Sequence, residues 1–371
     1  MFKDTMMHSD LSSEPKKQSS FKKILKILVQ VLLMIAIFGA LLWYVGVGAI
    51  YDALLTIKVE YLVLAFAIYF GINVLFAVRL RRVLAKDGVK TSFGKTLLAQ
   101  YAGMLTSDVT PGRSGYFLTP VYLRDQNIPS SKSLSAILGI QTIEFLIKVV
   151  GGIGAVIFLI QVVPATNWQA LGTFAGINVM LLIAALGIAL MLTGAIVLAA
   201  FTWSPRAISL FDRIANSRYL KRFTGGLMGK LEEYKDSAHK TRQAIPEILL
   251  LTMACWILKG FEWYFLGLAL GITQIPWIGY FLIHPLVTAL AFVPITPAGT
   301  GVQEFGIFGI FSVLIGVNPV TATAFALLSR GLLIFEDLAG LPQIVKSTSG
   351  LVFSRKKSKE TTLPEGTPIN T

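Results

Sequence analysis

The chain has 371 residues, of which 54% are hydrophobic and only 14% are charged. Its apolar residues lie in blocks of roughly 20 residues or more, so the composition excludes a soluble globular domain and predicts a polytopic membrane protein. The net charge of +13 would suit nucleic acid, but the basic residues are grouped between the apolar blocks, which favours an anionic membrane surface as their partner and argues against nucleic acid.

Six blocks are long enough to cross a bilayer as α-helices. In chain order they are residues 24–48, 59–78, 134–163, 171–201, 248–271 and 320–344. The first follows a polar, lysine-bearing tail and lacks a small-residue cleavage site, so we expect a span that stays in place rather than a signal peptide. Cys255 is the single cysteine, which leaves no disulfide framework and no cysteine-based metal site.

Two further blocks, 96–123 and 277–317, are apolar but interrupted. Each contains the frame T-P-x-x-[S/T]-G, as TPGRSG at residues 110–115 and as TPAGTG at residues 296–301. Proline and glycine disfavour an uninterrupted helix at both places. The two blocks are therefore predicted to be re-entrant or broken hairpins, each with its frame near the tip.

The basic residues set the expected topology. Of the 33 Lys and Arg, 26 fall in four segments, 3–26, 79–95, 206–242 and 346–359. The positive-inside rule places these segments, and with them both termini, on the cytoplasmic side of the cell membrane. The hairpin at 96–123 then starts and ends inside, and the one at 277–317 starts and ends outside, as in an inverted-topology repeat.

The predicted fold class is all-α, a polytopic membrane helix bundle of about six spans and two hairpins in an inverted repeat. Residues 24–165 form the first repeat, and residues 166–346 form the second. Within the second repeat, basic and apolar residues alternate in the region 206–245, which predicts amphipathic helix on the inner membrane surface. The polar tails 1–23 and 347–371 are expected to be disordered.

Irregular backbone at membrane depth persists only against protein or a water-filled cavity, so two breaks imply a cavity. We expect each turn to present a helix N-terminus, capped by Ser114 or Thr300, with free N–H groups that favour phosphate or carboxylate. Arg113, the single charge within the two turns, suits a bidentate anion, or else snorkels to the inner headgroups. Glu304 either compensates the helix dipole or serves as a functional carboxylate.

Polar residues inside two of the spans share helix faces. Gln141, Glu144 and Lys148 are spaced by three and four residues on the third span, and Lys259 and Glu262 by three on the fifth. Such groups form either neutralised structural pairs that face the bundle or contacts for a transported substrate.

The last span and the second hairpin carry further polar residues. Arg330 and Asp337 lie two turns apart on the last span, with Glu336 beside them. Arg330 is the expected exception to structural pairing, because it sits deep and its nearest acid in sequence is distant. His284 is either a packed residue or a ligand. Asp108, just before the first frame, either pairs with Arg113 or is a protonatable group.

These motifs resemble a known family. PGRSG followed by Tyr122, Leu123 and Arg124, then TPAGTGVQE and a last helix with Arg330, is similar to the transmembrane region of lysylphosphatidylglycerol synthetases, also called a flippase-like or uncharacterised integral membrane family. The resemblance runs from about the second span to residue 346. By it, two sets of residues match the family's motifs. These are Pro111, Gly112, Arg113, Gly115 and Arg124, and Pro297, Gly299, Gly301, Glu304 and Arg330.

The chain departs from the family pattern in three places. Tyr116 stands where an acid usually follows the first motif, and Ile140-Gln141 stands where the next helix often has Glu-Arg, so a different substrate is expected if that pair contacts the headgroup. The chain also ends soon after its last span, without the soluble aminoacyl-transfer domain. The resemblance therefore implies movement of lipids between leaflets without the synthetic half.

The leading hypothesis is a flippase-like protein for an anionic or lipid-linked substrate. The expected substrate-binding residues are Arg113, Ser114, Gly115, Arg124, Gln141, Glu144, Thr300, Gly301, Glu304 and Arg330. No nucleotide loop, catalytic motif, cofactor or metal site is predicted, since the three histidines are scattered. The alternatives are an intramembrane lipid-modifying transferase and an accessory subunit of a lipid or glycan synthesis enzyme. The expected partners are anionic membrane lipids. A homo-oligomer, or a complex with a synthetic enzyme, is also compatible with the sequence.

Overall fold

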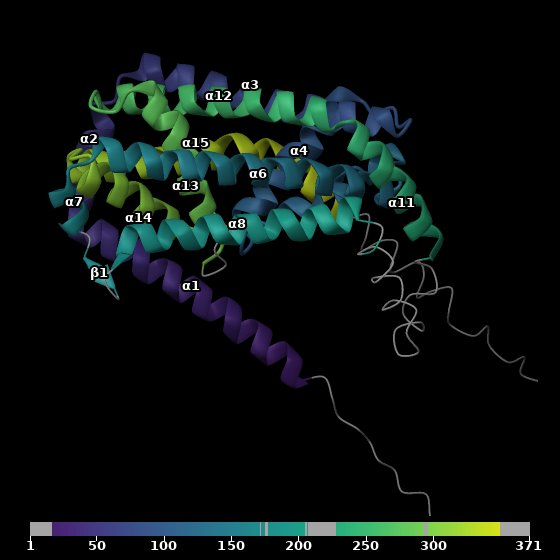
Figure 1. Ribbon diagram of the computed structural model, residues 1–371, viewed down its shortest axis with the longest axis horizontal. Helices are drawn as coiled ribbons and strands as arrows, with labels where there is room; N and C mark the ends of the chain where they lie inside the picture. Colours follow the sequence, from purple (N-terminus) through teal and green to yellow (C-terminus); the bar gives the residue numbers. More distant parts are fainter. Residues whose placement is uncertain are drawn as a thin grey trace, which may run out of the picture.

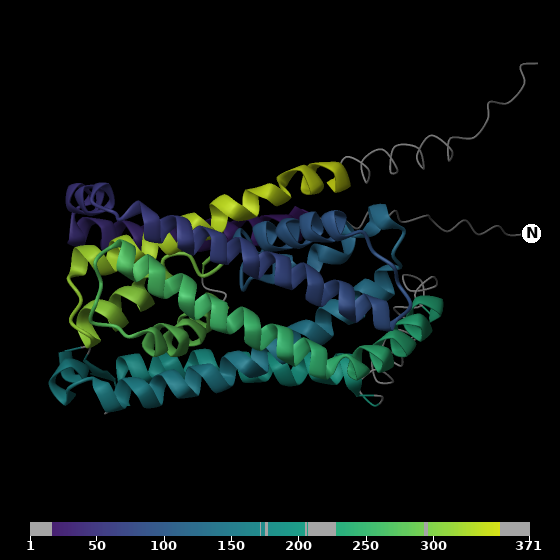
Figure 2. The same cartoon turned by 90° about the horizontal axis from the view of Figure 1, so that it is seen from above.

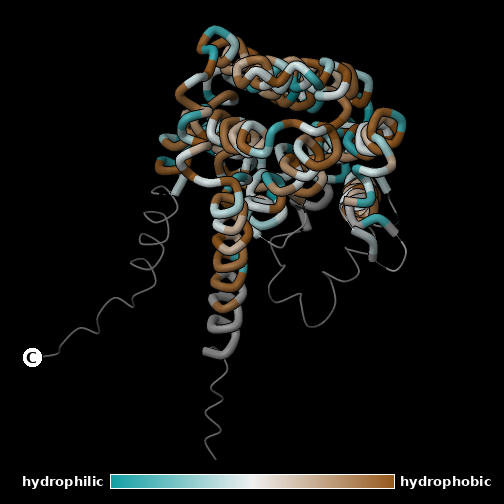
Figure 3. The backbone as a smooth tube through the Cα atoms, turned by 90° about the vertical axis from the view of Figure 1, so that its left-hand side faces the viewer, coloured by the Kyte–Doolittle hydropathy of each residue, from teal (hydrophilic) through white to brown (hydrophobic). Residues whose placement is uncertain are grey.

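The computed structural model describes residues 17–170, 172–174, 177–204, 206, 228–292 and 296–348. These residues are helical apart from turns and one small hairpin of two strands, β1 (Thr173–Phe174) and β2 (Ile177–Asn178). Most helices lie side by side along the long axis of the molecule, whereas α1 leans away from the rest (Figure 1, Figure 3). The predicted all-α polytopic bundle is confirmed.

Five helices are long and apolar enough to cross a membrane. They are α1 (Lys17–Val45), α3 (Val59–Lys86), α6 (Ser130–Val162), α8 (Val179–Trp203) and α12 (Ile245–Ala269). Each corresponds to a predicted span. Helix α8 begins eight residues later than expected because the β1–β2 hairpin comes first, and α3 ends eight residues later than expected. Helix α1 starts at Lys17, inside the predicted tail 1–23, where good helix formers continue the helix outward.

The sixth predicted span is a charged and interrupted helix. It forms α15 (Pro319–Asp337), then a single 3-10 turn, η4 (Leu338–Gly340), and further helix at residues 341–348. Arg330, Glu336 and Asp337 lie within it, so its composition is less apolar than that of the other five. This segment runs along the molecule as the yellow ribbon of Figure 2.

Both interrupted blocks fold as hairpins. The first hairpin enters as α4 (Phe93–Asp108) and returns through three short elements, η1 (Ser114–Leu118), α5 (Thr119–Tyr122) and η2 (Arg124–Gln126). The second enters as α13 (Trp277–Ala291) and returns as α14 (Val302–Phe308) and a π-helical turn, η3 (Gly309–Leu314). In Figure 1, α4 lies toward the end that carries α11, and α14 lies toward the opposite end.

Each hairpin has its own apolar core. Around the second hairpin, Trp263, Phe311 and Phe325 are buried together, with ring centroids 4.8 Å apart for Phe311 and Phe325 and 5.3 Å apart for Trp263 and Phe325. Around the first, the cluster includes Leu123 and Ile137. Two separate apolar cores leave a polar region between them where the hairpins meet.

The two ends of the bundle carry different connections. Short helices α2 (Val47–Leu55) and α7 (Ala165–Ala170) lie at one end, together with the β1–β2 hairpin (Figure 1). At the other end is α11 (Met228–Gln243), which covers part of the predicted surface region 206–245. Residues 207–227 of that region lie outside the described residues, and so do most of both predicted tails.

Helix α11 is attached to the bundle through Asp87, the residue that ends α3. The Ser237 hydroxyl donates to Asp87 at 2.6 Å, and Lys240 lies 3.1 Å from the same carboxylate. Lys240 also bonds Asp236, and this hydrogen bond raises the pKa of Lys240 and lowers the pKa of Asp236 from their ordinary values. Polar contacts therefore hold the basic end of the molecule together.

Candidate functional site

The two turns predicted from the repeated frame contact each other inside the bundle. The Ala298 N–H donates to the Thr110 carbonyl at 3.0 Å, and Pro111 and Pro297 form an isolated antiparallel bridge. Left-handed residues, with positive φ, follow both prolines: Gly112 and Arg113 in the first turn, and Ala298 and Gly299 in the second. The frame thus produces two tight turns whose backbones pair with one another, close to 190 residues apart in sequence.

The first turn closes with its own hydroxyl groups. The Gly115 N–H donates to Thr110 Oγ1 at 2.6 Å, and Thr106 Oγ1 donates to the Gly115 carbonyl at 3.1 Å. Ser114 does not cap the helix that follows, because its hydroxyl donates back to the Pro111 carbonyl at 2.9 Å. A Cβ atom at Gly115 would overlap the Thr106 carbonyl, so only glycine fits this close approach.

The second turn closes with a carboxylate. Glu304 Oε2 accepts the Gly301 N–H at 2.7 Å, while the Thr300 N–H donates to the Pro297 carbonyl at 2.9 Å. Gly301, not Thr300, is the residue that precedes α14. The N–H groups of Gly115, Thr300 and Gly301, predicted to be free, are therefore bonded to acceptors within or beside each turn.

A cavity of about 130 Å³ lies where the hairpins meet. Residues from α3, α4, α6, α12, α13, α14 and α15, together with the first turn, line it. Five of the predicted site residues contribute to the lining: Arg113, Gln141, Glu144, Glu304 and Arg330.

The other five predicted site residues do not line the cavity. Ser114, Gly115, Thr300 and Gly301 shape the turns, as the hydrogen bonds above show. Arg124 is exposed near the end of the first hairpin, at the start of η2. The sequence prediction therefore includes residues that shape the turns as well as residues that line the cavity.

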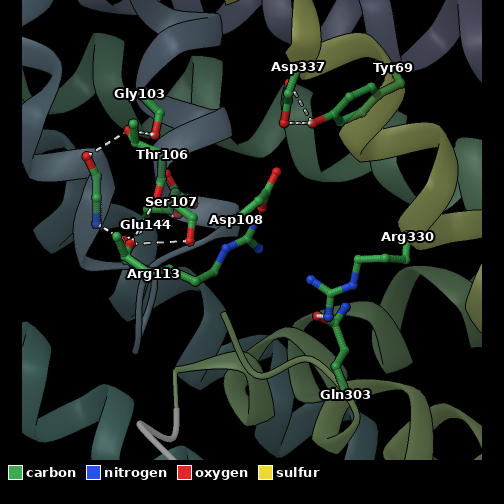
Figure 4. A network of polar contacts seen from close by, with 12 residues as sticks. Tyr69, Gly103, Thr106, Ser107, Asp108, Arg113, Glu144, Gln303, Arg330 and Asp337 are labelled. Carbon is green, nitrogen blue, oxygen red and sulfur yellow. Dashed lines mark hydrogen bonds and ion pairs between the residues drawn. The ribbon is translucent and has the colours of Figure 1, made fainter. Parts of the chain in front are cut away.

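Each turn contributes an ion pair to the cavity. Arg113 Nη2 lies 2.6 Å from Asp108 Oδ1, within the first hairpin. Arg330 of α15 reaches the second hairpin, where its Nε lies 2.6 Å from Glu304 Oε1 and its Nη2 donates to Gln303 Oε1 at 3.0 Å. Figure 4 shows Arg113 and Arg330 extending toward the same region from these two elements.

A third cluster spans α3 and α6. Glu144 accepts from Lys148 at 2.7 Å, as its i, i+4 spacing predicted, and from Arg79 at 3.2 Å. Arg79 also donates to Thr252 Oγ1 at 2.7 Å, and its guanidinium stacks on Phe76 with 4.7 Å to the ring centroid. We call Arg79, Glu144 and Lys148 the α3–α6 cluster.

The sequence analysis missed Arg79 as a cavity residue. It grouped Arg79 with the cytoplasmic segment 79–95, yet the side chain is only 1% exposed. Helix α3 continues to Lys86, seven residues further, so Arg79 lies about two turns inside the helix rather than at its end. A sequence prediction that extended the second span to the next turn signal, Gly88, would have placed Arg79 inside the helix.

The last group of polar residues surrounds Tyr69. Lys259 lies 2.5 Å from Glu262, as predicted, and 4.2 Å from the centroid of the Tyr69 ring. The Tyr69 hydroxyl donates to Asp337 at 3.1 Å. Asp337 thus has its partner on α3, and Arg330 pairs with Glu304 of the second hairpin rather than with an acid of its own helix. His284 lines the cavity and packs edge-on against Trp263.

The lining has an uneven charge balance. Five cationic side chains line the cavity, Arg79, Arg113, Lys148, Lys259 and Arg330, but only two carboxylates do, Glu144 and Glu304. Apolar side chains such as Phe76, Met104, Phe117 and Leu333 make up much of the remaining wall. Within the described residues, no group of three or more His, Cys, Asp or Glu is placed to hold a metal ion. This arrangement suits an anionic group attached to an apolar one.

Comparisons with known proteins agree with the resemblance noted from the motifs. The family model described as the lysylphosphatidylglycerol synthase TM region matches residues 27–336. A UPF0104 membrane protein of Pyrococcus horikoshii is 22% identical over 319 residues, which cover 83% of this chain and 92% of that protein. No solved structure matches the chain significantly.

Proposed function

Because the chain belongs to the lysylphosphatidylglycerol synthase transmembrane-region family, we propose that this multi-pass membrane protein moves a lipid with an anionic headgroup between the two leaflets. One observation carries the proposal. Cationic side chains line a cavity that lies between two opposed hairpins, inside a bundle of membrane-spanning helices. Charged residues at membrane depth are expensive, and they typically mark a pathway for substrate or ions.

The composition of the lining supports a lipid rather than a free ion. Its wall contains both charged groups and large apolar side chains, among them Ile72, Phe117 and Trp256. A headgroup could bind the cations while the first carbons of its chains contact the apolar wall. The remainder of each chain would stay in the surrounding bilayer, because the cavity is too small to enclose a whole lipid.

The contact between the two turns supports alternating access. The hairpins lie toward opposite ends of the bundle (Figure 1), and their turns contact each other through the Pro111–Pro297 bridge. The repeats 24–165 and 166–346 would then rock about this contact to open one side at a time. The paired turns would act as the pivot.

The distribution of charge supports an orientation in the cell membrane. The start of α1, helix α11 and the helical residues 341–348 lie toward the same end of the molecule (Figure 1, Figure 2). The same end carries Arg81, Arg82 and Lys86, at the end of α3. By the positive-inside rule, this end and both termini would face the cytoplasm.

Reconstitution into liposomes tests the proposal. Fluorescent phosphatidylglycerol and phosphatidylcholine, each labelled on one acyl chain, are incorporated into separate liposomes. A membrane-impermeant quencher reports the fraction of labelled lipid in the outer leaflet over time. We expect the protein to accelerate exchange of the anionic lipid over that of phosphatidylcholine and over protein-free liposomes. Equal rates with and without protein would reject the proposal, and a covalently altered lipid in the extract would favour a transferase.

A matched pair of glycine variants links the assay to the turns. Gly115→Ala forces a Cβ into the Thr106 carbonyl, so the first turn can no longer close, and we expect lipid movement to slow by about tenfold. Gly94→Ala, in α4 of the same hairpin, places its Cβ in open space and is expected to leave the rate unchanged. Equal rates for both variants would show that the turn does not control movement.

A further inference from the structure

Most cations of the cavity have a carboxylate of their own. Arg113 pairs with Asp108, Lys259 with Glu262 and Arg330 with Glu304. The α3–α6 cluster differs, because Arg79 and Lys148 share the single carboxylate of Glu144. Among the pairs that the structure describes around the cavity, this cluster alone has one positive charge more than its acids neutralise.

The surplus charge lies in a place where water does not compensate it. The Arg79 side chain is 1% exposed, and its Nε has no hydrogen-bond partner among the described residues. Lys148 and Glu144 face the cavity and are 15% and 16% exposed. A buried, uncompensated charge is strongly unfavourable unless another group neutralises it, so the arrangement leaves room for one anionic partner.

The surroundings of Arg113 are balanced. Asp108 is its direct partner, at 2.6 Å, so one carboxylate neutralises one cation. An anion approaching Arg113 would therefore compete with a carboxylate already in place. Arg330 offers no surplus either, since its guanidinium already bonds Glu304 and Gln303.

The geometry of the lining points to the chemistry of the ligand. We propose that the anionic headgroup binds at the α3–α6 cluster, between Arg79 and Lys148, and that the cluster selects a singly charged phosphodiester or carboxylate on an apolar body. This inference rests on the proposed function and locates its binding site. One surplus charge matches one negative charge, whereas a phosphate monoester would leave excess negative charge in an apolar wall.

Neighbouring side chains fit this role. Gln141 lies one turn before Glu144 on α6 and lines the same cavity, so its amide can donate to a headgroup oxygen. The aromatic ring of Phe292, 5.1 Å from Lys148 Nζ, covers the apolar side of the cluster. Glu144 competes with the bound anion for both cations, which gives the site a means of release.

A series of charge variants tests the site. Lys148→Gln removes the surplus charge, and we expect movement of phosphatidylglycerol in liposomes to fall by about tenfold. Lys148→Gln combined with Glu144→Gln leaves Arg79 as one uncompensated cation, and it should recover most of the wild-type rate. The control is Lys86→Gln combined with Glu247→Gln, which removes a balanced ion pair of 2.7 Å outside the cavity lining and should stay within about twofold of wild type.

Binding of a soluble probe gives a second readout. Dihexanoyl-phosphatidylglycerol, titrated into the purified protein in detergent, should lose affinity in Lys148→Gln and regain it in the double variant, while inorganic phosphate should compete poorly. If Lys148→Gln binds and moves the lipid as wild type does, the inference is wrong although the proposed function stands. If wild type binds dihexanoyl-phosphatidylglycerol and Lys148→Gln does not, but wild type moves no lipid, the site is right and the proposed function is wrong. If the yield of Lys148→Gln is too low for these assays, the double variant decides. Failure of the double variant to bind and move the lipid at close to the wild-type level would overturn the inference.

Discussion

The two hairpins have the same six-residue frame, yet they are stabilised in different ways. In the first, Thr110 and neighbouring hydroxyls bond the turn, and Asp108 and Arg113, which form the ion pair, are only five residues apart. In the second, Glu304 bonds the turn, and its cation, Arg330, comes from another helix 26 residues away. The frame thus specifies the turn geometry, while the charge that each turn brings to the cavity depends on the residues around it.

Loss of Glu304 should destabilise the second hairpin more than loss of Asp108 destabilises the first. Glu304→Ala leaves the buried Arg330 without a carboxylate and the Gly301 N–H without its acceptor, so we expect a loss of about 3–5 kcal/mol in stability. Asp108→Ala should destabilise less, because Asp108 contributes its ion pair to Arg113, whereas Glu304 contributes both an ion pair and the acceptor of the Gly301 N–H. Thermal unfolding of both variants in detergent checks the order.

The comparison of Glu304→Ala with Asp108→Ala separates two explanations of what stabilises the contact between the hairpins. A larger loss for Asp108→Ala would show that the local pair, not the pair between helices, holds the meeting point of the hairpins. The variant that combines Glu304→Ala with Arg330→Met serves as a control, since it removes the unpaired charge and should recover part of the stability.

The first threonine of each frame gives a more sensitive comparison. Thr110 Oγ1 accepts the Gly115 N–H, whereas the buried Thr296 Oγ1 has no partner among the described residues. Thr110→Val is therefore expected to destabilise by about 1–3 kcal/mol, because a buried amide loses its acceptor. Thr296→Val should be neutral or slightly stabilising, since it replaces an unpaired buried hydroxyl by a methyl group of similar shape. Equal shifts in the unfolding midpoint would contradict the difference between the turns.

The smallest effect is expected at Ser114. Its hydroxyl bonds the Pro111 carbonyl and is exposed, so water can replace that bond. Ser114→Ala should change stability by less than about 0.5 kcal/mol and leave lipid movement unchanged. A loss comparable to that of Thr110→Val would mean that Ser114 caps the following helix after all, and the same unfolding and liposome measurements reveal it.

The sequence predicted the parts of this protein that depend on local rules. Blocks of apolar residues set where the membrane helices lie, because a bilayer needs about 20 such residues per crossing. Proline and glycine at fixed places in the frame set the two turns, because they restrict or free the backbone angles directly. The pairs Glu144–Lys148 and Lys259–Glu262 were also predictable, since residues three or four apart share one helix face.

Only the tertiary structure decided how the two turns and the remaining charges meet. Arg79 and Glu144 are 65 residues apart, and Tyr69 and Asp337 are 268 apart, so no spacing along the chain reveals either contact. The same holds for Arg330, whose nearest acid along its own helix, Glu336, is not its partner. Partner choice for a buried charge follows from which helices pack together, because an unpaired charge in an apolar interior is so unfavourable that it takes whichever opposite charge the fold brings within reach.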